Sequence, residues 1–214
     1  MHVLITGASR GIGASLKNAY ENDGHSVIGT STKGTADLVP LDVSNPEGFG
    51  AIKDAIADTP LDLLVCNAGI YDDQGEDLAT GYDANMWARM MAVNVTGVFQ
   101  TVQTALPNLQ AARGKVAIIS SQMGSSTRAK GTSIIYRVSK AAVLNLGFNL
   151  SSALKPDGIA VGIYHPGWVK TDMGGSAADI TVEESASGLA REFAALSLEN
   201  TGCFRTWDGR DHPI

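Results

Sequence analysis

The sequence predicts an α/β fold in which a parallel sheet carries helices on both faces. Three observations lead to this prediction: short apolar runs recur along the chain, a longer helical pattern follows nearly every run, and turn residues separate the two. A strand buried on both faces is a near-continuous hydrophobic run. Strands that alternate with helices form parallel sheets through right-handed crossovers. No repeat or linker interrupts the pattern, so residues 1–214 are expected to form a single domain.

Each strand is expected where an apolar run stands between turn residues. The seven runs lie at residues 3–5, 26–30, 38–43, 61–67, 115–120, 159–165 and 203–206. The run at 61–67 is apolar enough for the centre of a sheet. Polar, glycine-containing stretches at 70–80, 121–133 and 166–180 are expected to be loops.

Helices are expected at residues 11–23, 46–58, 84–112 and 134–155, and from about 181 onward. The first is amphipathic and ends at Asp23-Gly24. The second begins with a cap at Ser44-Asn45 and proline in its first turn. Pro107 is expected to bend or break the third. Pro156-Asp157-Gly158 closes the fourth, and Thr181–Glu184 is a capping-box candidate for the fifth.

Composition excludes several classes of protein. The chain has 214 residues, 44% hydrophobic and 18% charged, with a net charge of −6. The negative charge and the lack of a basic block argue against a nucleic-acid partner. No apolar run approaches the roughly 20 residues that span a bilayer. The chain enters its first strand at once, so no signal peptide is expected, the two cysteines are expected as reduced thiols, and a cytoplasmic location is predicted.

The turn after the first predicted strand is the main candidate for a binding site. It reads Thr6-Gly7-Ala8-Ser9-Arg10-Gly11-Ile12-Gly13, a G-x-x-x-G-x-G spacing directly before a helix. Glycines let the backbone approach an anion, and free N–H groups at the helix N-terminus point at it. The alternative is a glycine turn without a ligand. The candidate phosphate-binding residues are Gly7, Ser9, Arg10, Gly11, Ile12 and Gly13.

Further candidates follow the ends of other strands. Asn67-Ala68-Gly69 follows the fourth strand, Ser120-Ser121 the fifth, and Pro166-Gly167 the sixth. In open α/β sheets, ligands bind beyond the carboxyl ends of the strands. These residues are therefore expected to gather around the ligand of the glycine turn.

Tyr136 and Lys140 lie four residues apart in a predicted helix, so their side chains share one face. A cation beside a phenol favours the phenolate. Lowering the pKa of the phenol to near neutrality takes roughly 2–3 units, or about 3–4 kcal/mol. Such a tyrosine exchanges a proton with a carbonyl or alcohol oxygen. The pair by itself is weak, because Tyr-x-x-x-Lys also arises by chance on a surface.

Taken in order, the motifs resemble the short-chain dehydrogenase/reductase family over the whole chain. They are Thr6–Gly13, Asn67–Gly69, Asn94, Ser121, Tyr136–Lys140 and Pro166–Thr171. The resemblance implies a three-layer Rossmann-type fold with a seven-stranded, mostly parallel sheet in the order 3-2-1-4-5-6-7. It also implies hydride transfer with a nicotinamide cofactor. The segment from Pro166 to Gly188 looks most like the small C-signal-like carbonyl reductase branch.

The resemblance also implies a role for each motif. Tyr136 is the general acid/base, Lys140 holds the nicotinamide ribose, and Ser121 polarises the substrate oxygen. Asn94 distorts its helix and holds a water in a proton relay to Lys140. The remaining cofactor residues that it implies are Asn67, Ala68, Gly69, Pro166, Gly167, Val169 and Thr171. No metal site is expected.

One spacing departs from the family pattern. Ser121 precedes Tyr136 by fifteen residues, which is longer than usual in the family and implies an insertion in the loop 122–133. Ser121 remains the best candidate because the fifth strand runs into it. Ser120, Ser125 and Ser126 remain rivals.

Charge favours NADP(H) over NAD(H). An NAD enzyme usually places a carboxylate about 20 residues past the glycines. Here the second strand ends in Gly29–Lys33 without one. Arg10, Thr30, Ser31 and Lys33 suit a 2′-phosphate, which a carboxylate would repel. Asp42-Val43 resembles the family's contact with adenine, although Asp42 also fits a turn before a helix.

The sequence therefore predicts an NADP(H)-dependent oxidoreductase that acts on an aldehyde, a ketone or a secondary alcohol. The alternative is a nucleotide-binding signalling or regulatory protein on the same fold with little turnover. A homodimer or homotetramer through the two long helices is expected by resemblance. The identity of the substrate depends on loops that the sequence does not define.

Overall fold

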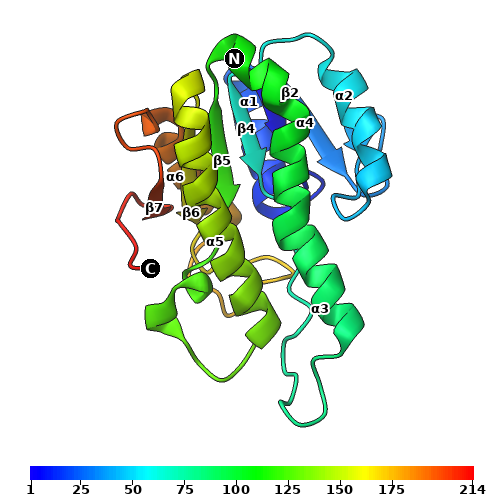
Figure 1. Cartoon of the computed structure of the whole chain (residues 1–214), viewed down its shortest axis with the longest axis vertical. Helices are drawn as coiled ribbons and strands as arrows, with labels where there is room; N and C mark the ends of the chain where they lie inside the picture. Colours follow the sequence, from blue (N-terminus) through cyan, green and yellow to red (C-terminus); the bar gives the residue numbers. More distant parts are fainter.

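The computed structural model describes residues 1–214, which form a seven-stranded parallel sheet in the order β3-β2-β1-β4-β5-β6-β7 (Figure 1). The Rossmann-type fold and the strand order expected above are confirmed. The strands are β1 (His2–Ile5), β2 (Ser26–Ser31), β3 (Leu38–Pro40), β4 (Leu63–Cys66), β5 (Lys115–Ile119), β6 (Ala160–His165) and β7 (Cys203–Thr206).

Helices cover both faces of the sheet. The α-helices are α1 (Gly11–Asn22), α2 (Gly50–Ile56), α3 (Ala84–Met91), α4 (Gly97–Ala112), α5 (Ile134–Leu154) and α6 (Val182–Ala195). The short turns are η1 (Pro46–Phe49), η2 (Ala92–Thr96), η3 (Gln122–Gly124), η4 (Ser126–Arg128) and η5 (Lys155–Asp157). In Figure 1, α4 and α5 lie in front of the sheet, and α1 and α6 lie behind it.

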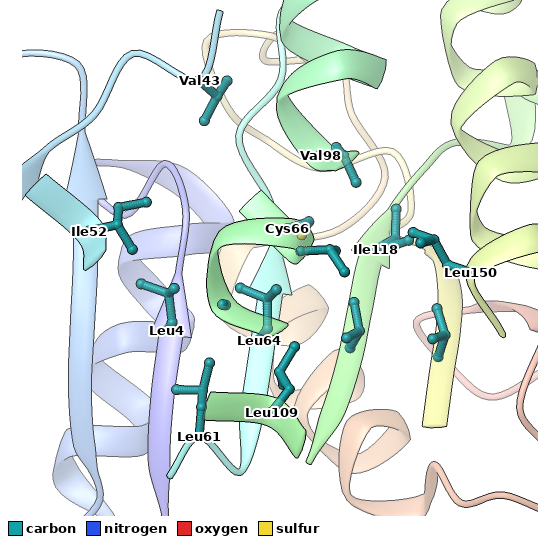
Figure 2. Close-up of a cluster of buried hydrophobic side chains, with 14 of the residues drawn as sticks. Leu4, Val43, Ile52, Leu61, Leu64, Cys66, Val98, Leu109, Ile118 and Leu150 are labelled. Atoms are coloured by element: carbon teal, nitrogen blue, oxygen red, sulfur yellow. The ribbon is translucent and has the colours of Figure 1, made fainter. Parts of the chain in front are cut away.

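Alternate residues of the central strands enter two separate cores. In β4, Leu64 and Cys66 pack with α2, α4 and α5, as Figure 2 shows, whereas Leu63 and Val65 pack with α1 and α6. In β1, Leu4 and Ile5 divide in the same way. Because side chains alternate across a strand, an apolar run without polar interruptions is what a sheet covered on both faces requires.

Several boundaries differ from those expected. β3 ends at Pro40 rather than at residue 43, because it is an edge strand and β2, its only neighbour, ends at Ser31. The expected helix 46–58 begins with η1 and becomes α-helical at Gly50. The predicted caps are present, since Asn45 accepts from the Glu47 amide and Thr181 and Glu184 form a capping box.

The long helix is interrupted, but not at the proline. α4 continues through Pro107 to Ala112, so the break expected there is absent. The interruption is η2, a π-helical turn that joins α3 to α4 and contains Asn94. Turns of this kind often occur at functional sites.

The two cysteines do not form a disulfide. Cys66 is buried in β4 and Cys203 is half-buried in β7, and β5 and β6 lie between these strands. Burial raises the pKa of the Cys66 thiol to about 12. None of the helices combines the length and the apolar character that crossing a bilayer demands.

Candidate functional site

The glycine turn between β1 and α1 needs glycine at Gly7, Gly11 and Gly13, for reasons of backbone conformation or of space. Gly7 and Gly11 have φ of 68° and 55°, in the left-handed region that favours glycine. A Cβ atom on Gly13 would lie 2.3 Å from the Gly7 carbonyl oxygen and 2.6 Å from Asn67 Nδ2. No side chain caps the N-terminus of α1, so its free amides face the space that the glycines leave open.

The end of β4 holds this turn in place. Asn67 Nδ2 donates to the carbonyl oxygens of Thr6 and Gly7, each at 3.0 Å. The Thr6 hydroxyl accepts from the amides of Asn67 and Ala68 at 3.0 and 3.1 Å. A polar cluster therefore joins the first crossover to the centre of the sheet, and a displacement of either part disturbs the other.

Gly13→Ala is expected to destabilise the protein by about 1–3 kcal/mol, because the added methyl group enters occupied space. Urea unfolding of the purified variant measures the loss. Gly50→Ala is the matched control, since Gly50 has a helical φ of −55° and a Cβ there meets nothing within 4 Å. Equal stability of the Gly13 variant and the parent would show that the turn is looser than described.

The Tyr136–Lys140 pair lies in the first two turns of α5 and is buried, with exposures of 7% and 5%. Lys140 Nζ lies 5.6 Å from the centroid of the Tyr136 ring and donates to the Ile119 carbonyl oxygen at 3.1 Å. The end of β5 thus fixes the ammonium group beside the phenol, as the spacing of the two residues predicts.

Burial shifts the pKa values of both groups. It raises the pKa of Tyr136 above its usual value, and a hydrogen bond with the Ser121 side chain partly opposes this effect. Burial lowers the pKa of Lys140 to about 8. Both changes favour the neutral forms. A phenol in this environment keeps its proton and is suited to donate it.

Among the candidate serines, only Ser121 lies close enough to the Tyr136 hydroxyl to lower its pKa. It also accepts from the Met123 amide at 3.1 Å, as the cap of η3. The Ser120 hydroxyl instead donates to the Lys140 carbonyl oxygen at 3.0 Å. Ser125 pairs with Thr127, and Ser126 donates to the Ile214 carbonyl oxygen. The longer spacing before Tyr136 is taken up by η3, η4 and the loop that follows.

Asn94 lies in η2 and is 1% exposed. Its side chain accepts from the Ile70 amide and donates to the Ile70 carbonyl oxygen, both at 2.9 Å, and it donates to Ser139 Oγ at 3.0 Å. A Cβ on Gly69 would lie 3.3 Å from Asn94 Oδ1 and 3.5 Å from Lys140 Nζ. Asn94 therefore joins α5 to the chain that leaves β4, close to the ammonium group of Lys140.

A single cavity of about 580 Å³ connects the glycine turn with Tyr136 and Lys140. This volume lies within the range of cofactor and ligand sites. Fifteen of the residues expected to bind cofactor line it: Gly7, Ser9, Arg10, Gly11, Ile12, Ser31, Asp42, Val43, Asn67, Ala68, Gly69, Tyr136, Lys140, Pro166 and Thr171. The expected cofactor residues outside the lining are Gly13, Thr30, Lys33, Gly167 and Val169. Of the expected catalytic residues, Tyr136 and Lys140 line the cavity and Asn94 and Ser121 do not, whereas Ser120 does. The glycine turn, the helix N-terminus without a side-chain cap and the buried Tyr136–Lys140 pair all border one cavity, and this combination fits a dinucleotide.

The residues expected to select the cofactor differ in their placement. Arg10 lines the cavity and forms an exposed ion pair with Asp172. Thr30 is buried, and its hydroxyl accepts from the Gly7 amide at 3.4 Å. Lys33 is exposed and lies outside the lining, whereas the adjacent Thr32 lines it. The Asp42 carboxylate accepts from the Ser44 hydroxyl and amide, which lowers its pKa, so Asp42 forms the turn and also lines the cavity.

Several residues at this site were not among those predicted from the sequence. Arg89 of α3 reaches the cavity and pairs with Asp72 at 2.7 Å. Met173 and Val182 also line the cavity. Asp73 is completely buried at the start of α5. No periodicity or spacing marks these residues, because each reaches the site from a loop or a neighbouring helix.

The sheet order and the glycine turn define a Rossmann-type α/β protein whose site lies at the carboxyl ends of the strands. The profile of the family described as short chain dehydrogenase matches residues 1–180. The chain therefore belongs to the short-chain dehydrogenase family, and the resemblance found in the sequence is confirmed.

Individual proteins show the same relationship. The C-signal of Myxococcus xanthus is 36% identical over 157 residues, covering 72% of this chain and 93% of that protein. The 1-hydroxy-2-glutathionyl-2-methyl-3-butene dehydrogenase of Rhodococcus sp. (strain AD45) is 30% identical over 224 residues, covering 97% and 96%. The structure of NADPH-bound carbonyl reductase from chicken fatty liver has a TM-score of 0.88 at 27% identity and covers 100% of this chain and 98% of that one.

Proposed function

We propose that this protein is an NADP(H)-dependent reductase of aldehydes or ketones that also catalyses the reverse oxidation of secondary alcohols. The observation that carries the proposal is the single cavity joining a glycine turn suited to phosphates with a buried Tyr136–Lys140 pair. Ser121 is close enough to the same tyrosine to lower its pKa. A protein that only bound a nucleotide would not need these acid–base groups.

In the proposed reduction, the Tyr136 hydroxyl donates its proton to the carbonyl oxygen of the substrate as that oxygen gains negative charge. The Ser121 hydroxyl donates a hydrogen bond to the same oxygen. Lys140 holds the ribose hydroxyls, and its ammonium group stabilises the phenolate that forms on Tyr136. The bound nicotinamide cofactor supplies the hydride. Asn94 fixes the position of Lys140 relative to the chain after β4, because its side chain is hydrogen-bonded to Ser139 on α5 and to Ile70.

The proposed preference for NADP(H) rests on Arg10 and on the hydroxyls of Ser31 and Thr32, which line the cavity at the end of β2 with no carboxylate among them. The ion pair between Arg10 and Asp172 is exposed and therefore weak. A 2′-phosphate competes with Asp172 for the guanidinium group. The chicken carbonyl reductase, bound to NADPH, supports this preference.

Arg10→Ala is expected to weaken NADPH binding about tenfold or more and to leave NADH binding unchanged, because a hydrogen-bonded charge pair is worth about 1.5–3 kcal/mol. Isothermal titration calorimetry with both cofactors measures the difference. Lys33→Ala is the matched control, since Lys33 lies outside the cavity. A similar loss for both cofactors in the Arg10 variant would contradict a selective role.

The proposed activity is tested by mixing the protein with NADPH and a panel of aldehydes and ketones and following the nicotinamide absorbance. Turnover of at least one carbonyl compound is expected. Tight NADPH binding without turnover of any compound on the panel would favour the alternative, a nucleotide-binding signalling or regulatory protein. The buried Tyr136, Lys140 and Ser121 set favours the enzyme.

We also propose that the protein forms a homodimer or a homotetramer through α4 and α5. Phe99 of α4 and Val138 of α5 are each 42% exposed, so each of the two helices presents an apolar side chain to the solvent. Light scattering determines the oligomer size in solution.

A further inference from the structure

The first turn of α5 is held by a residue from another part of the chain. Ser133, its N-cap residue, has a left-handed φ of 53° and makes no capping hydrogen bond with its side chain. Asp73 replaces it: Oδ2 accepts from the amides of Ile135 and Tyr136 at 2.7 and 3.2 Å. Asp73 belongs to the loop between β4 and α3, which lies at the same end of the molecule as the start of α5 (Figure 1).

The same loop contacts the catalytic tyrosine a second time. The Tyr71 ring stacks on the Tyr136 ring with a centroid distance of 4.1 Å and an interplanar angle of 26°. The Tyr71 hydroxyl is hydrogen-bonded to Ser133 Oγ at 2.5 Å, so the side chain of the N-cap residue pairs with Tyr71 rather than with the helix backbone. The backbone and the ring of Tyr136 are thus both fixed by the two ends of the segment from Tyr71 to Asp73.

Asp73 is an unusual helix cap. Its exposure is 0%, and no lysine, arginine or histidine pairs with it. Oδ1 is buried and has no hydrogen-bond partner. Placing a carboxylate in such surroundings is costly even with two amide donors. A purely structural cap need not be buried, as Asp83 shows: it is exposed and accepts from the Asn85 and Met86 amides at 2.8 and 3.1 Å at the start of α3.

We propose that Asp73 is a positioning residue for Tyr136, which fixes the first turn of α5 and keeps the phenol in place as a proton donor. The inference rests on the proposed function, in which Tyr136 donates a proton to the carbonyl oxygen of the substrate. A negative charge beside the ring opposes formation of a second negative charge on the phenolate oxygen. Asp73 therefore biases Tyr136 towards the protonated state that carbonyl reduction requires.

The other polar groups around Tyr136 come from four parts of the chain. They are Lys140 on α5, Tyr71 in the loop after β4, Ser121 before η3 and Tyr82 before α3. Burial, Tyr71 and Asp73 raise the pKa of Tyr136, and Ser121 lowers it. None of these other groups is a carboxylate. Removal of the Asp73 carboxylate is therefore expected to lower the pKa of Tyr136.

The test compares Asp73→Ala, Asp73→Asn and the matched control Asp83→Ala. Asp73→Ala removes the acceptor and is expected to lower kcat about 10–100-fold with little change in the KM for NADPH, since a displaced proton donor affects the chemical step. Asp73→Asn keeps an acceptor oxygen and is expected to restore most of the lost kcat. In both variants, the fall of kcat at high pH is expected to begin at a lower pH than in the parent protein. Asp83→Ala is expected to show neither effect.

Two measurements do not depend on turnover. Amide exchange of Ile135 and Tyr136, followed by NMR without cofactor, is expected to accelerate in Asp73→Ala but not in Asp73→Asn. The ring of Tyr136, labelled with carbon-13, is expected to titrate at a lower pH in Asp73→Asn than in the parent. Absence of turnover in the parent would overturn the proposed function alone. An unchanged amide exchange of Ile135 and Tyr136 in Asp73→Ala would overturn the positioning role. An unchanged titration of Tyr136 in Asp73→Asn would overturn the effect of the Asp73 charge, also where Asp73→Ala fails to fold.

Discussion

Tyr136→Phe is expected to lower kcat about 10²–10⁴-fold, the contribution of a positioned general acid, while the Kd for NADPH stays unchanged. Only the hydroxyl is lost, so the stacking of the ring on Tyr71 and its burial in α5 are preserved. Single-turnover absorbance measurements give the rate of the chemical step, and calorimetry gives the affinity for the cofactor.

Tyr20→Phe is the control for this variant. Tyr20 is 7% exposed in α1 and packs into the core on the other face of the sheet, so loss of its hydroxyl is expected to leave kcat unchanged. If Tyr136→Phe retained the parent's kcat, another group would be the proton donor.

Lys140→Met is expected to abolish most of the activity and to leave the folded state at least as stable at pH 7. The loss of activity follows because no ammonium group remains to stabilise the phenolate or to hold the ribose. The stability follows because burial lowers the pKa of Lys140 from 10.5 to about 8, so keeping the side chain charged below pH 8 costs up to about 3 kcal/mol. Part of this gain in folding stability is offset, because the Ile119 carbonyl oxygen loses the hydrogen bond that Lys140 donates to it.

The same shift predicts a pH dependence of stability. The unfolded chain binds a proton at Lys140 up to about pH 10.5, and the folded chain binds it only up to about pH 8. The cost of charging Lys140 is therefore fully present below pH 8 and is relieved as the pH rises from 8 to 10.5. Urea midpoints at pH 7 and pH 10 measure this gain. The parent is expected to gain more than Lys140→Met over this range, and an equal change in the two proteins would contradict a buried ammonium group.

Most of the fold could be predicted because burial on both faces leaves a strong pattern in short strands. The runs around Leu4, Leu64 and Ile118 have no polar interruption, and each becomes a strand of the doubly covered sheet. Boundaries were less predictable where the partner decides them, as at β3, which ends when β2 does. Pro107 does not break the helix, because α4 continues through it, whereas the interruption at Asn94 agrees with the helix distortion that the family resemblance implied there.

The candidate site could be predicted only as far as its residues lie at strand ends or share a helix face. Tyr136 and Lys140 are one helical turn apart, so their proximity is local. Asp73 is 62 residues from the Ile135 amide that it binds, and Arg89 reaches the cavity from α3. Contacts of this kind depend on how a loop and a helix pack, which no short-range pattern encodes.

The π-helical turn η2 sets the angular phase between α3 and α4. One residue of an α-helix corresponds to a rotation of about 100°, so deleting a single residue between Ala92 and Thr96 would turn the whole of α3 about its axis. Met90, buried against Ile135 and Tyr136, would swing away from them, and Arg89 would leave the cavity. The π-helical turn thus keeps Arg89 and Met90 of α3 aligned with Tyr136 on α5. A chain shortened by one residue here would lose this alignment, although its strands would be unchanged.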